Sequence, residues 1–290
     1  MRGPCLVRLG SALTVLAALA VSLSSCGEGH GELSQSVAEQ HADYRLIDLS
    51  DGSSSYRAEV PDLGENPAYR DHLLVMHRLP PYTATIGAGS DEPFADDDER
   101  PAHQTAIGES YVAVFELTRA QWQVIAAGTS PWIDLGVHDG DSRHPATGMS
   151  QIEAETVLAA WSAQHGVNLM LPSADEWEGA ARCTGGAFAF DPLQPSAVGA
   201  HARVAESLVT DSGTSSGTAP VGQRVANPWG FYDMQGNAAE LTAGLDPDAF
   251  AVVRGGSWSD PVATTRATNS VAIPPQAGHP LVGLRLVVHP

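Results

Sequence analysis

The chain has 290 residues, of which 43% are hydrophobic and 17% charged, a balance that suits a folded globular protein and not a disordered one. Its formal net charge is −19, and all 15 basic residues are arginine. This negative charge repels phosphate backbones and argues against a nucleic-acid partner. It leaves divalent cations or cationic ligands open, beside the simpler interpretation that the acidity serves solubility.

The first 26 residues are typical of an export signal. Arg2 and Arg8 precede an apolar run from about residue 9 to residue 21, which is too short for a good membrane span. The following "LSSC" resembles the lipobox of bacterial lipoproteins. The resemblance implies that residues 1–26 are a lipoprotein signal, that Cys26 carries the lipid, and that the chain is exported and anchored to a membrane of the cell envelope. The alternative is an ordinary secreted protein in which this cysteine is accidental.

Residues 27–70 are polar and mixed, and we interpret them as a linker with one strand near Tyr56–Val60. The folded domain is predicted to span residues 71–290. Its first clear strand is the alternating "YTATIG", which ends in a glycine turn at Gly87.

Three helices are predicted from the residues at their ends. The predicted caps and stops are Thr118 and Gly128, Ser150 and Gly166, and Ser173 with Gly185–Gly186. Ser173 and Glu176 have the spacing of a capping box. The 3.6-residue period places the second helix's apolar side chains on one face, at Ile152, Val157, Leu158 and Trp161.

From Gly186 to the C-terminus, glycine, proline, asparagine and tryptophan separate short strands, and no long periodic helix is predicted. So long a stretch with few regular elements is unusual in a compact domain. It indicates binding loops, or loops held by a metal.

The chain contains Cys5, Cys26 and Cys183. If the signal is removed and Cys26 is acylated, Cys183 is the one free thiol of the folded domain. This count excludes an intrachain disulfide and any zinc or iron–sulfur site built from cysteines.

Several phrases occur in a fixed order: "LPSADEWEGAAR", "NPWGFYDMQGNAAEL", "VVRGGSW" and "GLRLV". Together with "TATIGAGSDE" and "ESYVAVFELTRAQW" they resemble the sulfatase-modifying factor family, the formylglycine-generating-enzyme-like domain. The resemblance extends from about Leu73 to the C-terminus. It implies an α+β domain of the C-type-lectin-like type, with little regular secondary structure and structural calcium.

The "YDMQGNAAEL" phrase carries the calcium expectation. Two carboxylates with backbone carbonyls between them make an oxygen-rich cage suited to Ca²⁺. By resemblance, the ligands are the side chains of Asp233 and Glu240 and the carbonyls of Gly236 and Ala238. The alternative is a solvated acidic turn.

Enzymatic members of the family bind copper through two cysteines placed shortly after "GGS". In this chain those positions are Asp260 and Thr265. Soft thiolates select Cu(I), and hard oxygens do not hold it in that way. The sequence therefore argues against copper and against formylglycine generation by that mechanism.

The resemblance also places a ligand pocket around "RGGSW", with the candidate residues Arg254, Trp258, Asp260, Thr265 and Arg266. Trp258 offers a flat apolar face, and Arg266 can bind a carboxylate with two hydrogen bonds. The leading hypothesis is a non-catalytic, lipid-anchored domain that binds a small ligand or an envelope protein. Two alternatives stay open: an oxidoreductase with a metal site free of cysteine, and a structural docking module of the envelope.

Overall fold

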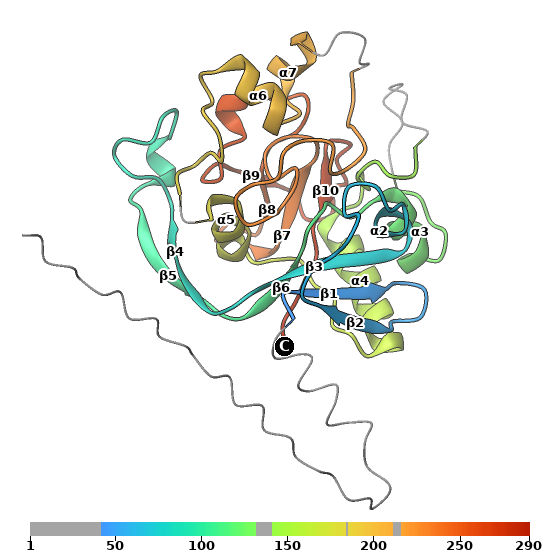
Figure 1. The fold of residues 1–290 in the computed structure, drawn as a ribbon. Coiled ribbons are helices and arrows are strands. Elements are labelled where there is room, and N and C mark those ends of the chain that lie inside the picture. Colours follow the sequence, from blue (N-terminus) through green and yellow to red (C-terminus); the bar gives the residue numbers. More distant parts are fainter. Residues whose placement is uncertain (1–41, 132–140, 184, 211–215) are drawn as a thin grey trace, which may run out of the picture.

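The structure is a computed structural model that describes residues 42–131, 141–183, 185–210 and 216–290 (Figure 1). The predicted signal and Cys26 lie outside these residues. The helices are α2 (Ala68–Asp71), α3 (Arg119–Ile125), α4 (Gln151–His165), α5 (Ala174–Arg182), α6 (Pro195–His201) and α7 (Ala205–Thr210). The first six strands are β1 (Tyr44–Asp48), β2 (Ser54–Arg57), β3 (Leu73–Leu79), β4 (Tyr82–Ile86), β5 (His103–Ile107) and β6 (Ser110–Ala113). The later strands are β7 (Ala239–Leu245), β8 (Ala251–Arg254), β9 (Ser270–Ile273), β10 (Val282–Leu284) and β11 (Val287–Val288).

The strands form three sheets. A five-stranded antiparallel sheet has the order β11-β6-β3-β1-β2, so the last strand of the chain lies beside strands of the first half. A four-stranded sheet has the order β10-β7-β8-β9, in which β10 runs parallel to β7. The hairpin β4–β5 stands apart and passes along α5 (Figure 1). The mixture of short helices and short sheets confirms the predicted α+β class.

The predicted linker contains part of the folded body, which corrects the domain boundary at residue 71. β1 pairs with β3, and Ile47 of β1 is completely buried. The single strand predicted near Tyr56–Val60 is β2, which begins two residues earlier and ends at Arg57. The five residues of β1 are too few to show a clear alternation of apolar and polar side chains. Pairing with β3 makes this segment a strand.

The helix ends follow the predicted capping residues. The side chain of Thr118 accepts a hydrogen bond from the Gln121 amide, and Ser150 begins α4 in the same way. Ser173 and Glu176 form the predicted capping box of α5. Two helices end earlier than predicted: α3 stops at Ile125 and α5 stops at Arg182.

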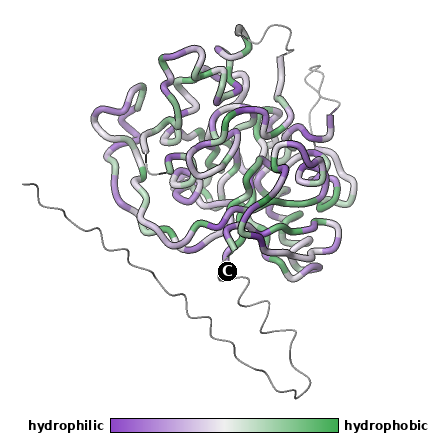
Figure 2. The backbone as a smooth tube through the Cα atoms, viewed as in Figure 1, coloured by the Kyte–Doolittle hydropathy of each residue, from purple (hydrophilic) through white to green (hydrophobic). Residues whose placement is uncertain are grey.

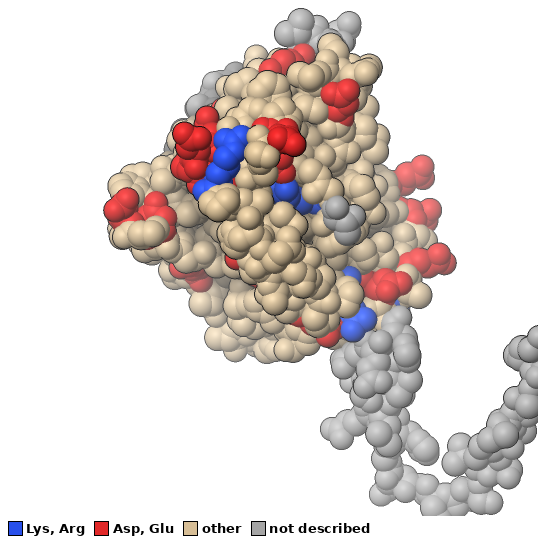
Figure 3. Space-filling view, turned by 90° about the vertical axis from the view of Figure 1, so that its left-hand side faces the viewer, with Lys and Arg blue, Asp and Glu red and all other residues tan. Residues whose placement is uncertain are grey.

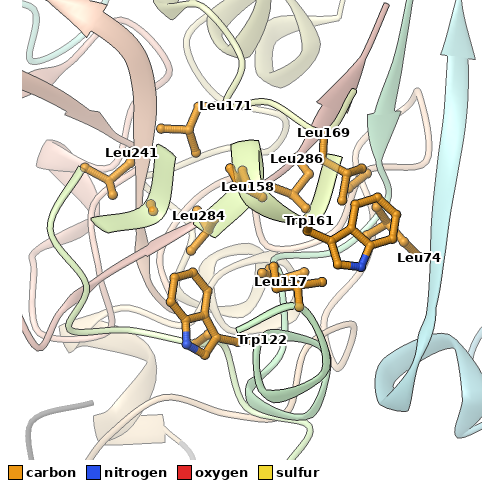
Figure 4. Close-up of a cluster of buried hydrophobic side chains, with 14 of the residues drawn as sticks. Leu74, Leu117, Trp122, Leu158, Trp161, Leu169, Leu171, Leu241, Leu284 and Leu286 are labelled. Carbon is orange, nitrogen blue, oxygen red and sulfur yellow. The ribbon is translucent and has the colours of Figure 1, made fainter. Parts of the chain in front are cut away.

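The main hydrophobic core lies where α4 meets the strands. Leu158 and Trp161 of α4 pack beside Leu284 and Leu286, and Trp122 of α3 closes the cluster (Figure 4). Ile152 is an exception to the predicted apolar face, because it is 48% exposed at the first turn of α4. The side chains that replace it on the buried face are Gln151 and Ala154.

Hydrophobic and hydrophilic stretches alternate over short distances along the backbone (Figure 2). Each short element therefore buries one side and exposes the other. None of the helices in the described part of the chain combines the length and hydropathy needed to cross a membrane.

Candidate functional site

The "RGGSW" segment is a tight turn that follows β8. Gly255 has a φ of +84°, and a Cβ at this position would lie 2.9 Å from Cζ2 of Trp177. Glycine is therefore required both for the backbone conformation and for the close approach of α5. After the turn, the amide of Trp258 donates to the carbonyl of Asn237 at 3.0 Å. The indole side chain of Trp258 is half-buried.

The two positions that correspond to the copper cysteines are occupied by oxygens that bond within their own loop. Oδ2 of Asp260 accepts hydrogen bonds from the amide of Ser257 at 2.8 Å and from its hydroxyl at 2.6 Å. Thr265 is completely buried, and its hydroxyl donates to the carbonyl of Val262 at 2.9 Å. Both side chains stabilise the loop that follows the turn.

Arg266 binds a carboxylate, and that carboxylate belongs to the same chain. Its guanidinium is 2% exposed and donates through Nε to Oε2 of Glu99 at 2.9 Å and through Nη2 to Oε1 of the same residue. A further bond reaches Asp96 at 3.1 Å. Burial opposes ionisation of Glu99, but the hydrogen bonds from Arg266, Thr268 and the Asp96 amide, with the charge of Arg266, together outweigh it and hold the pKa of this carboxyl below its ordinary value. The arginine thus holds the acidic loop, residues 87–102 between β4 and β5, against the segment that follows the turn.

Arg254 points in a different direction, toward α5. It lies 3.3 Å from Oε2 of Glu178, and Oε1 of the same carboxylate lies 3.3 Å from Arg182. Arg182 in turn pairs with Glu92 of the acidic loop. Glu178 and Arg182 are four residues apart on α5, and each has a further charged partner outside the helix. Acidic and basic groups lie next to one another on the face of the molecule shown in Figure 3. The predicted pocket residues thus direct their polar groups to separate parts of the chain.

The four predicted calcium ligands belong to one buried stretch, residues 233–240, which enters β7 at Ala239. Asp233, Ala238 and Glu240 are at most 5% exposed. A Cβ on Gly236, which has a φ of +86°, would collide with the carbonyl of Arg203. Oδ2 of Asp233 accepts a hydrogen bond from the amide of Gly222 at 2.6 Å. The loop therefore gathers both predicted carboxylates into the interior.

Glu240 already has a cationic partner. Oε1 of Glu240 accepts from Nη2 of Arg285 at 2.7 Å, and Oε2 accepts from Nε at 3.0 Å. Oε2 also accepts from the indole of Trp177 at 2.6 Å. Arg285 is completely buried and further donates to the carbonyls of Ala113 and Tyr232. This residue comes from "GLRLV", the last phrase of the resemblance, and fixes the loop to the five-stranded sheet.

A third buried carboxylate, Glu116, adjoins the same loop and was not predicted. Its oxygens accept from the amide of Ala238 at 2.9 Å and from the side-chain amide of Asn237 at 2.6 Å. Burial, then the charges of Asp233 and Glu240, raise the pKa of Glu116 well above its ordinary value. The pKa of Asp233 is also raised, because burial outweighs the effects of Gly222 and of the nearby arginines. The available sequence signal was a charged residue inside the apolar run "VAVFEL", since a buried charge requires partners.

The sequence matches the family described as "Sulfatase-modifying factor enzyme 1-like domain" over residues 75–290. The chain belongs to this family. The match begins in β3 and takes in the turn, the acidic loop and the buried carboxylate cluster. β1, β2 and α2 precede it. The comparison with curated proteins gives no match.

Solved structures support the same fold. The chain is 22% identical to "PvdO from Pseudomonas aeruginosa", with a TM-score of 0.66 that covers 76% of this chain and 96% of that one. For "Treponema denticola variable protein 1" the identity is 18% and the TM-score 0.62, with 75% and 96% covered. "CarF" has 22% identity and a TM-score of 0.54, with 73% and 98% covered. These three have the C-type-lectin-like fold of the sulfatase-modifying factor family, and at such identities the likeness concerns the fold alone.

Among the described residues, the one thiol lies at the C-terminal end of α5 and not in the turn. Cys183 is 9% exposed and donates a weak hydrogen bond to the carbonyl of Ala180. Burial raises the pKa of the thiol to about 11. The group is therefore protonated at neutral pH, and a protonated thiol is a poor nucleophile and a poor metal ligand.

Proposed function

We propose that this chain is a non-catalytic member of the sulfatase-modifying factor family. It binds a small ligand or an envelope protein through the face formed by the "RGGSW" turn and the loops beside it. The observation that carries the proposal is the state of the two copper-cysteine positions. Asp260 holds Ser257, and Thr265 is buried with its hydroxyl bonded to Val262. The one thiol among the described residues, Cys183, is buried on α5. A pair of thiolates for Cu(I) cannot form from these residues.

The alternative oxidoreductase requires Asp260 to act as a metal ligand together with histidine. Among the described residues, the group whose ligand atoms lie close enough for a metal is Asp96, Asp98 and Glu99, which contains no histidine. Two of its members already bind Arg266. This arrangement favours the binding role over a cysteine-free redox centre.

The catalytic test incubates the purified protein with copper, O₂ and a cysteine-containing sulfatase peptide. Mass spectrometry should detect no aldehyde in the peptide, and aldehyde formation would refute the proposal. The matched experiment restores the thiols. We expect the double variant Asp260→Cys/Thr265→Cys to bind Cu(I) more tightly than either single variant, because two thiolates select this ion. Equal copper affinity of the single and double variants would show that the scaffold no longer brings these positions together.

We include structural calcium in the proposal, because charge in the buried loop favours a divalent cation. Glu116, Asp233 and Glu240 are three buried carboxylates, and Arg285 pairs with one of them. A cation held by Asp233, Glu240 and the carbonyls of Gly236 and Ala238 would offset the remaining negative charge. Calcium supplies no reaction step here, and its effect would be to hold the loop.

We further propose that Cys26 anchors the exported chain to a membrane through a lipid. The support is the sequence of the first 26 residues, in which a basic start and an apolar run precede "LSSC". The Cys26→Ala variant should move from the membrane fraction to the soluble fraction after export. A variant that stays with the membrane as firmly as the parent chain would exclude this anchor.

A further inference from the structure

A cavity of about 430 Å³ lies between the β1–β2 hairpin and the segment that leads into β3. All its lining residues precede the stretch matched by the family, which begins at residue 75. The cavity is therefore built by the part of the chain that the family domain does not include. Figure 1 shows β1 and β2, in blue, at the outer end of the five-stranded sheet beyond β3.

One wall of the cavity comes mainly from one face of the hairpin, and Ser53 and Ser54 at its turn also line it. The register pairs Leu46 with Ser55 and Tyr44 with Arg57. Side chains alternate along a strand, and directly paired residues share a face, so Leu46, Ser55 and Arg57 lie on the same side of the sheet. Asp48 lies two residues after Leu46 on that side. The opposite wall comes from Val60, Pro61, Asn66 and Tyr69.

The lining combines an apolar middle with a charge at each end. Leu46 is buried, and Val60 and Leu73 are partly buried, so they give the floor its hydrophobic character. Asp48 closes β1, whereas Arg57 faces the beginning of that strand. Four residues of extended strand separate the two ends, which is about 13 Å at about 3.3 Å a residue.

Both terminal charges are available to a ligand. Oδ1 of Asp48 accepts hydrogen bonds from the amide of Ser50 at 2.9 Å and from its hydroxyl at 2.5 Å. Arg57 is exposed and donates to the carbonyl of Tyr56 at 3.1 Å. Within the described ranges, neither charged group forms an ion pair. A ligand complementary to this wall carries a cation at one end, an anion at the other and an apolar group between them.

We propose that the cavity binds a short peptide of about three residues with free termini. Its α-ammonium group lies at Asp48, its α-carboxylate at Arg57, and a central apolar side chain rests on Leu46 and Val60. Three extended residues span about 10 Å, and the long arginine side chain covers the remaining distance. This site is separate from the turn and the loops of the proposed function, and the two proposals stand or fall independently.

The test uses the purified full chain in detergent and the tripeptide Ala-Leu-Ala, with binding followed by saturation-transfer NMR. Arg57→Gln and Asp48→Asn should each weaken binding about threefold to fivefold, the range of an exposed ion pair. Ser55→Trp should abolish binding, because the indole would fill the cavity. The same tripeptide with acetylated and amidated ends should bind at least about tenfold more weakly, because it loses both ion pairs together.

Arg78→Gln is the matched control. This substitution removes the same charge from the same sheet, but Arg78 of β3 pairs with Glu109 and does not line the cavity. The affinity of the Arg78→Gln variant for the tripeptide should equal that of the parent chain. The proposal is overturned if the blocked peptide binds as tightly as the free one, if Arg78→Gln weakens binding as much as Arg57→Gln, or if the free peptide gives no signal at millimolar concentration.

Discussion

Two groups of charged side chains hold the loops of this domain, and their charges are balanced differently. Beside the "RGGSW" turn, Arg254, Arg182 and Arg266 each face a buried or partly buried acid of the same chain. Around the buried segment that leads into β7, Glu116 and Glu240 adjoin Asp233, and Arg285 pairs with Glu240. The first group is complete without a ligand. The second retains buried negative charge, which requires either a bound cation or a proton.

The comparison explains why the two predicted sites differ in structure. At the turn, Arg266 makes the bidentate contact expected for a ligand carboxylate, but with Glu99. At the predicted calcium site, Asp233 and Glu240 are buried, and a third acid, Glu116, lies beside them. Matched charges hold parts of the chain together, whereas the excess buried negative charge must be offset either by a bound cation or by protonation.

The largest expected effect comes from removing the arginine of the second group. Arg285→Ala leaves Glu240 buried without its cation, and loss of one partner of a buried pair costs about 3 to 5 kcal/mol. Urea unfolding should show a corresponding fall in the free energy of unfolding. Arg78→Ala, which breaks the partly exposed pair with Glu109, should cost less than about 1 kcal/mol. Equal losses in the two variants would contradict the assignment of Arg285 as the central partner of the loop.

An intermediate effect is expected at the first group. Glu99→Gln keeps the shape of the side chain but removes the charge that faces Arg266, and charged hydrogen bonds contribute about 1.5 to 3 kcal/mol. Asp96→Asn is the control, because the Asp96 side chain is 76% exposed and its loss should change stability by no more than about 0.5 kcal/mol. If the two variants unfold at the same urea concentration, the acidic loop is not fastened through Glu99.

The smallest effect concerns calcium, because it depends on the free ion. At ten times the dissociation constant, a ligand bound only by the folded state adds about 1.4 kcal/mol. A chelator should therefore lower the midpoint of thermal unfolding, and calcium but not magnesium should restore it. Asp233→Asn should abolish this response. A midpoint that is the same with chelator and with calcium would remove calcium from the proposal and leave protonation of Glu116 as the means of reducing the buried charge.

Local signals in the sequence were sufficient for several elements. Thr118, Ser150 and Ser173 predicted three helix starts, because a side-chain oxygen at that position satisfies an amide that the first turn leaves free. The alternating "YTATIG" predicted β4. Ile152 shows the limit of such patterns, because the buried face of α4 begins at Gln151 and Ala154, and Ile152 is turned away from that face.

The sequence by itself determined the family, the helix starts, the single thiol of the folded domain, and the presence of Asp260 and Thr265 where relatives hold copper. These follow from residue identity and short spacing. Tertiary structure alone decided that β1 and β2 belong to the sheet, that Arg266 binds Glu99, and that Glu116 joins Asp233 and Glu240. These contacts connect residues more than a hundred positions apart or depend on strand pairing, and no local pattern specifies which distant charge a buried group will meet.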